Sequence, residues 1–170
     1  MQAASKIRDD EGRYGRLEEH FEAVADAVHP SARQLIDFWR QREAGGGFVV
    51  GRDVPSCALK RVLYNIALFE PIVENGVIVD FRARLAGDGL RLRFGRDIAG
   101  ERMSKMFSRQ EFDAHLARTL DSLARGEPAL VRSELRRGTL VERRLEVVVL
   151  PVWNQKKTER WVLVGIFYFG

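Results

Sequence analysis

Apolar residues recur along the chain with two different periods, and each period predicts a different kind of element. Near the amino terminus, residues 17–28 and 31–43 carry apolar side chains at helical spacing, with Pro30 between the two segments and "AGGG" at 44–47 after the second. Both segments are therefore expected to be helices. Their apolar faces have to pack on a sheet or on a second copy of the chain. We expect the dimer or partner interface to consist of Leu17, Phe21, Val24, Leu35, Phe38 and Trp39.

The rest of the chain alternates between strand signals and helix signals. "LYNIALFEPI" and "VIVDFRARL" flank the turn "ENG" and predict a hairpin, and three further strand-like runs fill residues 129–169. Between the hairpin and these runs, Asp88 and Gly95 bound a short helix. Ser108 and Glu111 have the spacing of a capping box, which predicts a longer helix that ends at Gly126.

Composition places the chain among ordinary globular proteins. It has 170 residues, of which 45% are hydrophobic and 31% are charged. We expect a flexible tail at 1–12, a helical segment at 13–46 for dimerisation or sheet packing, and the main domain at 47–170. The apolar runs are too short to span a bilayer, and we expect a cytoplasmic protein.

The net charge of +4 comes with acidic residues interspersed among the arginines. We interpret the pairs Arg136/Arg137 and Arg143/Arg144 as a solvated face with cross-strand ion pairs. A nucleic-acid-binding surface is the weaker alternative, because such surfaces usually cluster positive charge without interleaved acids.

Three stretches carry a family resemblance. They are "RQLIDFWRQREAGG" at 33–46, "RLAG" at 84–87 and "FGRDIAG" at 94–100. Together with the order of elements they resemble the small stand-alone bacterial PAS domain proteins. The resemblance implies an α+β fold with a five-stranded antiparallel sheet in the order 2-1-5-4-3 and helices from 88–126 on one face. It also implies a sensory or adaptor module of bacterial signalling that acts by protein–protein contact, as a homodimer or with a separate signalling partner.

In such a fold, the apolar side chains of the helical segment would meet the sheet. They either close as a plain core or leave a cavity for a small apolar ligand, and the sequence leaves both open. The expected pocket residues are Phe81, Leu90, Phe94, Ile98, Met103, Met106, Phe107, Phe112, His115 and Leu116.

Candidate chemistry is sparse. The glycines at 87 and 89 are not followed by the third glycine of a dinucleotide fingerprint, so they are expected to turn the chain. Haem ligation by His115 and flavin photochemistry at Cys57 are disfavoured, no metal site is expected, and we name no catalytic residue. We expect no enzyme. The alternative is a small cone-shaped isomerase or dehydratase in which His115 and Asp113 supply an acid and a base.

Overall fold

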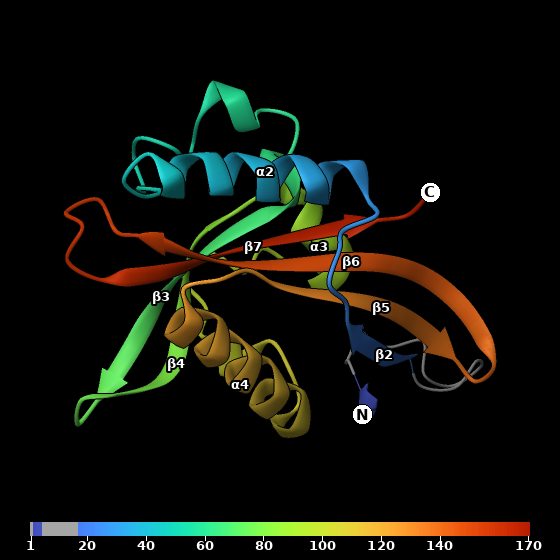
Figure 1. Ribbon diagram of the computed structural model, residues 1–170. Helices are drawn as coiled ribbons and strands as arrows, with labels where there is room; N and C mark the ends of the chain where they lie inside the picture. Colours follow the sequence, from blue (N-terminus) through green and yellow to red (C-terminus); the bar gives the residue numbers. More distant parts are fainter. Residues whose placement is uncertain (1, 5–16) are drawn as a thin grey trace.

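An antiparallel sheet carries the fold, and its strands are hydrogen-bonded in the order β1-β2-β5-β6-β7-β3-β4 (Figure 1). The computed structural model describes residues 2–4 and 17–170. In this part of the chain the strands are β1 Gln2–Ala4, β2 Leu17–Ala23, β3 Ile66–Glu74, β4 Val77–Ala86, β5 Ala129–Arg137, β6 Leu140–Trp153 and β7 Arg160–Tyr168. The α-helices are α2 Pro30–Ala44, α3 Arg91–Phe94 and α4 Arg109–Arg125, with short 3-10 helices η1 Cys57–Leu59, η2 Leu63–Asn65, η3 Asp88–Leu90 and η4 Met103–Lys105.

The predicted fold class and strand order are confirmed. The five predicted strands are β3 to β7, and their spatial order β4-β3-β7-β6-β5 is the expected 2-1-5-4-3. All of these neighbours pair antiparallel. The sheet is wider than predicted, because β2 pairs with the free edge of β5 and β1 pairs with β2.

The helix predicted at 17–28 is wrong, because residues 17–23 form the strand β2. Its register pairs Leu17 with Arg137 and Ala23 with Val131, so β2 covers most of the length of β5. Backbone pairing with an otherwise open edge strand outweighs a weak helical spacing. Of the tail predicted at 1–12, residues 2–4 form β1 and the remainder lies outside the described residues.

Both faces of the sheet are buried. Successive residues of β3 point to opposite sides: Ala67 and Phe69 belong to the core under α4, whereas Ile66 and Leu68 belong to the core under α2. Figure 1 shows these two helices on opposite sides of the sheet. Burial on both faces explains why β6 and β7, in the middle of the sheet, carry nearly continuous apolar runs. The helices of 88–126 cover one face as expected, and α2 covers the other.

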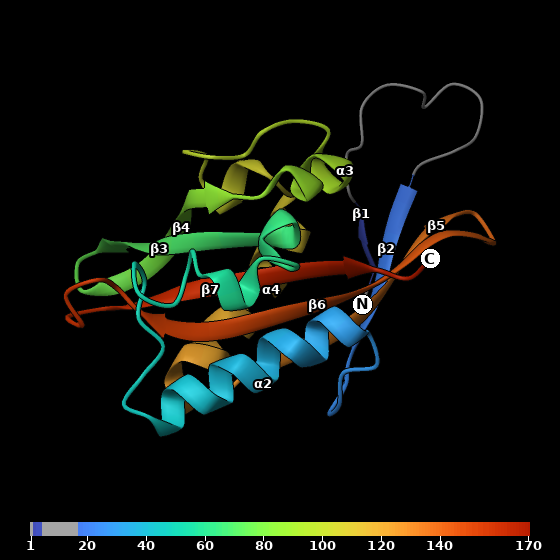
Figure 2. The ribbon, with the colours of Figure 1, turned by 90° about the horizontal axis from the view of Figure 1, so that it is seen from above.

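The interface predicted on the second helix is corrected to sheet packing. Leu35 and Trp39 of α2 are buried against the sheet of the same chain, and the Trp39 Nε1–H donates to the carbonyl of Pro151 at 2.6 Å. Phe38 is half-buried and packs edge-to-face on Phe48. Figure 2 shows α2 lying alongside β6. A second copy therefore cannot reach the apolar face of this helix.

Buried polar contacts fix the start of α2. The helix begins at Pro30 after an N-cap at His29, not at Ser31 as predicted. The Glu146 carboxylate of β6 is fully buried and accepts from the backbone N–H of Val28 at 2.9 Å and of His29 at 2.5 Å. Burial alone would raise the pKa of Glu146, but these hydrogen bonds, together with Arg132, lower it.

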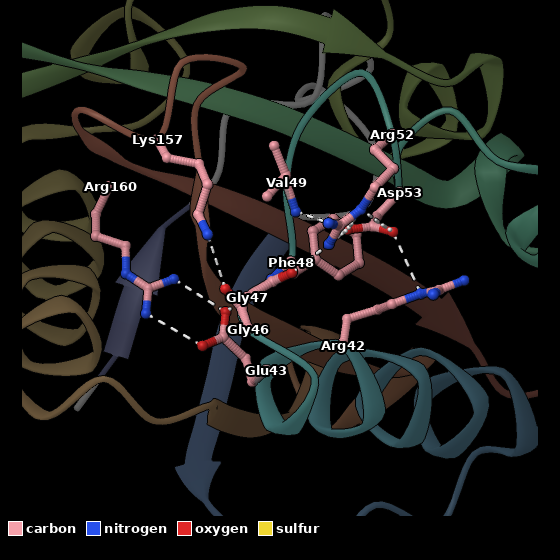
Figure 3. A network of polar contacts seen from close by, with 10 residues as sticks. All are labelled: Arg42, Glu43, Gly46, Gly47, Phe48, Val49, Arg52, Asp53, Lys157 and Arg160. Carbon is pink, nitrogen blue, oxygen red and sulfur yellow. Dashed lines mark hydrogen bonds and ion pairs between the residues drawn. The ribbon is translucent and has the colours of Figure 1, made fainter.

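A second polar network fixes the end of α2 (Figure 3). Arg160 of β7 binds the Glu43 carboxylate with contacts of 3.0 and 3.2 Å. In the loop that follows the helix, the buried Asp53 accepts from the Val49 N–H at 2.7 Å and pairs with Arg42 at 3.2 Å. Each end of α2 is thus tied to the sheet or to its adjoining loop.

Candidate functional site

Two helices and their caps position one wall of the candidate site. The turn formed by η3 and α3 ends at Gly95, which adopts a left-handed φ of 70°. Helix α4 begins after Ser108, whose hydroxyl accepts from the Glu111 N–H at 3.3 Å, and it ends at Gly126 with φ 65°. The capping box and both glycine stops predicted from the sequence are confirmed. The start predicted at Asp88 is not capped by that side chain.

A narrow cavity lies between these helices and the sheet. Side chains of β6 and β7, such as Val147 and Val164, form its floor, and water-sized molecules have about 50 Å³ in which to place their centres. One water needs roughly 10–15 Å³ in this measure, so the cavity has room for a few waters, or for a short chain of bonded atoms, which lie closer together than waters do. Six of the ten predicted pocket residues line it, namely Leu90, Phe94, Met103, Met106, Phe107 and His115.

The other four predicted pocket residues belong to the closed core around the cavity. Phe81, Ile98 and Phe112 are buried in that core, and Leu116 packs against it while partly exposed. The sequence left open whether the interior is filled or hollow. In the structure most of this core is filled by side chains, and a small cavity remains at one end.

Polar side chains from four elements meet at one end of the cavity. Arg93 of α3 donates to Glu19 Oε2 of β2 at 3.0 Å, and the Ser133 hydroxyl of β5 donates to Glu19 Oε1 at 3.1 Å. The side chains of Glu19 and Arg93 are each only 3% exposed. His115 of α4 lies beside this pair, with its Nε2 4.0 Å from Glu19 Oε2.

The contacts of His115 favour one tautomer of its neutral ring. Arg118 Nη1 lies 3.3 Å from His115 Nδ1. A guanidinium can only donate, so Nδ1 accepts, and the proton of the neutral ring is on Nε2. This Nε2 is buried, and within the described part of the chain it has no hydrogen-bond partner. His115 therefore holds an unused donor at the cavity.

The environment of His115 favours its neutral form. Its ring packs on Phe107 with a centroid distance of 4.3 Å. Burial lowers the pKa of His115 to about 4, the Glu19 carboxylate opposes this shift, and Arg118 and Arg93 add to it.

This shift predicts a stability change at mildly acidic pH. The unfolded chain takes up the His115 proton near pH 6.5, whereas the folded protein resists it down to about pH 4. The free energy of unfolding should therefore fall by about 2 kcal/mol between pH 7 and pH 5 from this residue alone. Urea unfolding at both pH values measures the fall, and His115→Phe should remove that share of it. An equal fall in the variant would contradict the assignment.

Tyr168 adds a second unused polar group near this end of the core. Its hydroxyl is buried and has no hydrogen-bond partner among the residues that the structure describes. Burial raises the pKa of Tyr168, and the charges of Arg93, Arg143 and Glu19 also act on it. The hydroxyl therefore lies within electrostatic range of the Glu19–Arg93 pair.

Most of this polar end was not predicted from the sequence. Glu19 and Arg118 were not named, and Arg93 was overlooked although it lies three residues after Leu90, on the same helical face. The acid proposed for the enzyme alternative is elsewhere: Asp113 pairs with Arg109 at 3.2 Å, and its side chain is 58% exposed. Glu19, and not Asp113, is the acidic neighbour of His115.

The residues of the predicted amino-terminal interface contact their own chain. The Phe21 ring stacks on His115 with centroids 6.2 Å apart, and the guanidinium of Arg118 lies 4.5 Å above the Phe21 centroid. Val24 packs against the core under α2. The side chain of Leu17 lies outside the described residues.

A comparison with models of protein families identifies the family of this chain. The model described as a PAS domain matches residues 27–167, which is more than half of the chain. The chain belongs to the PAS domain family. PAS membership supports a role as a sensory or signalling module in general. Searches of curated proteins and of solved structures give no significant match. No helix in the described ranges has the length and apolar character needed to cross a bilayer.

The residues that line the cavity come partly from the segment that matches the PAS model and partly from a strand that precedes it. Helices α3 and α4 and the strands β3 to β6 lie within residues 27–167, whereas β2 precedes them. Glu19 therefore reaches the cavity from a strand outside the matched segment. The PAS part supplies the apolar walls together with Arg93 and His115, and the added strand supplies the carboxylate that Arg93 binds.

The arginines of the β5–β6 hairpin are largely paired. Arg136 and Arg144 both contact Glu134, and Arg137 binds Glu142 at 2.7 Å. These contacts agree with the solvated, ion-paired face expected from the sequence. Paired arginines offer less free positive charge to a polyanion, so the nucleic-acid alternative loses its main argument.

Proposed function

We propose that this PAS domain is a sensory module whose signal depends on a small molecule in the cavity between α3, α4 and the sheet. The observation that carries the proposal is the cavity itself, with apolar walls and polar groups gathered at one end. Ligand sites in proteins typically have this composition, because the apolar walls bind the ligand body and a few polar groups orient it.

The signal would leave the module by contact with another protein chain. A homodimer and a separate signalling partner are both consistent with a PAS domain, and the dimer stays a prediction. The apolar face of α2 is not the contact surface, because Leu35 and Trp39 pack inside the chain. The expected cytoplasmic location also stays a prediction.

Native mass spectrometry tests the proposal directly. Protein purified gently from cells should show the mass of a dimer, and each chain should retain a small molecule that dissociates when the collision energy is raised. Denaturing mass spectrometry of the same sample controls for covalent adducts. A monomer that carries no small molecule, and that gains none when incubated with a cell extract of metabolites, would contradict both parts of the proposal.

The enzyme alternative is less well supported. Its carboxylate would now be Glu19, but Arg93 and Ser133 already occupy both of that residue's oxygens. We therefore favour a non-enzymatic sensory role.

A further inference from the structure

The charges at the polar end of the cavity do not cancel. Among the described residues, three ionised groups line it: Arg93 and Arg118 are positive and Glu19 is negative. Burial lowers the pKa of Arg118 from its usual value, but a guanidinium stays protonated at neutral pH. His115 is neutral there. The polar end thus carries a net charge of one positive unit, which a single negative charge would balance.

The hydrogen-bond donors and acceptors at this end of the cavity are also unbalanced. Both Glu19 oxygens already accept hydrogen bonds, from Arg93 and Ser133. The His115 Nε2–H is a buried donor without an acceptor in the described part of the chain. Leaving such a donor unpaired is costly, so the site favours a partner that brings an acceptor.

From these two observations we propose that the cavity binds a small carboxylic acid in its anionic form. The carboxylate would accept from the His115 Nε2–H and lie in the positive field of Arg93 and Arg118, while its short apolar body contacts Phe94, Phe107 and Met106. This inference rests on the proposed function, because it names the ligand class of the same cavity.

Other head groups fit the site less well. An ammonium would add a positive charge beside Arg93 and Arg118, and the charge of the Glu19 carboxylate is already balanced by Arg93. A pure hydrocarbon would leave the His115 donor unpaired in an apolar environment. An amide supplies an acceptor but does not balance the charge. The affinity order should therefore be carboxylate, then amide, then amine.

Matched probes of equal size test this order. Hexanoate, hexanamide and hexylamine share one apolar body and differ in the head group, and butyrate and benzoate with their amides vary the body. Calorimetric titration of the purified full chain at pH 7 should give binding to the carboxylates at least tenfold tighter than to the matching amides, with no binding of the amine.

Two variants connect the binding to the named residues. His115→Phe removes the donor at nearly constant shape and should weaken hexanoate binding about tenfold, without lowering stability at pH 7. Arg118→Gln should also weaken it by removing one positive charge. Arg125→Gln is the control, because it removes an equal charge from an exposed ion pair with Asp121 on the same helix, and it should bind hexanoate like the wild type.

The outcomes separate this inference from the proposed function. Equal binding of amide and carboxylate would overturn the acid as the ligand class, while the cavity would stand as a ligand site. Unchanged hexanoate binding in both His115→Phe and Arg118→Gln would also overturn it. No binding of any probe would overturn it as well, and the molecule retained in native mass spectra would then decide the sensory proposal independently.

Discussion

Replacing Gly87 with alanine should destabilise the fold by about 3 kcal/mol or more, which corresponds to a fall in Tm of about 10 °C for a domain of this size. Gly87 follows β4 and closes against η2. A Cβ on this residue would lie 2.3 Å from the carbonyl oxygen of Leu63 and 2.4 Å from that of Tyr64. Both atoms belong to the backbone, so no side-chain rotation relieves the clash.

A second glycine provides the matched control. Gly45 at the end of α2 has a φ of −90°, which any residue adopts, and an added Cβ would lie 3.5 Å from the Gln41 oxygen. Gly45→Ala should change the free energy of unfolding by less than about 0.5 kcal/mol. Urea unfolding of both variants compares them, and similar stabilities for the two would show that the backbone near Leu63 can move aside.

The same glycine shows which part of the fold could be predicted. It belongs to the "RLAG" stretch, where the sequence predicts the end of a hairpin strand and a turn of the chain. The alternation through Phe81 and Ala83 and the turn chemistry around it are local signals. The order of β3 to β7 followed from the resemblance built on such stretches. Register, bulges and the covering of the second face depend on packing between distant segments, which local patterns do not specify.

The strand β2 could not have been distinguished from a helix by its pattern. "LEEHFEA" places Leu17 and Phe21 at a helical spacing, but it equally places Glu19, Phe21 and Ala23 at alternating positions. The free edge of β5 decides between the two, because β2 supplies the backbone partners of that edge. Whether β5 has a free edge depends on the arrangement of the whole sheet, which the local sequence of β2 does not contain.

The cavity shows the same division between local and distant information. The helical side of its apolar lining was predicted, because the segment between β4 and β5 contains few other large apolar residues. Its polar end was not, because Glu19 and Arg93 lie 74 positions apart. Among the arginines at 91, 93 and 96, only Arg93 is buried, and its position three residues after Leu90 is the one local sign of this.

The second large expected effect is a loss of stability when the buried Glu19–Arg93 pair is broken. Arg93→Met should lower the free energy of unfolding by about 3 kcal/mol or more, because it leaves the Glu19 carboxylate buried without its positive partner. Glu19→Met should cause a comparable loss. The double variant should recover most of the stability, since two methionines fill a similar volume without a buried charge.

A double-mutant cycle by urea unfolding measures this coupling. The exposed pair Arg109–Asp113 is the control, and its own cycle should give a coupling below about 1 kcal/mol. Hydrogen exchange of the β2 amides adds a local measurement. Exchange should be faster in each single variant than in the double variant. The reason is that a buried charge without a partner favours local opening of β2, which exposes the charge to water. A small coupling for Glu19–Arg93 would mean that water reaches the pair, and the positive field inferred for the cavity would then be weak.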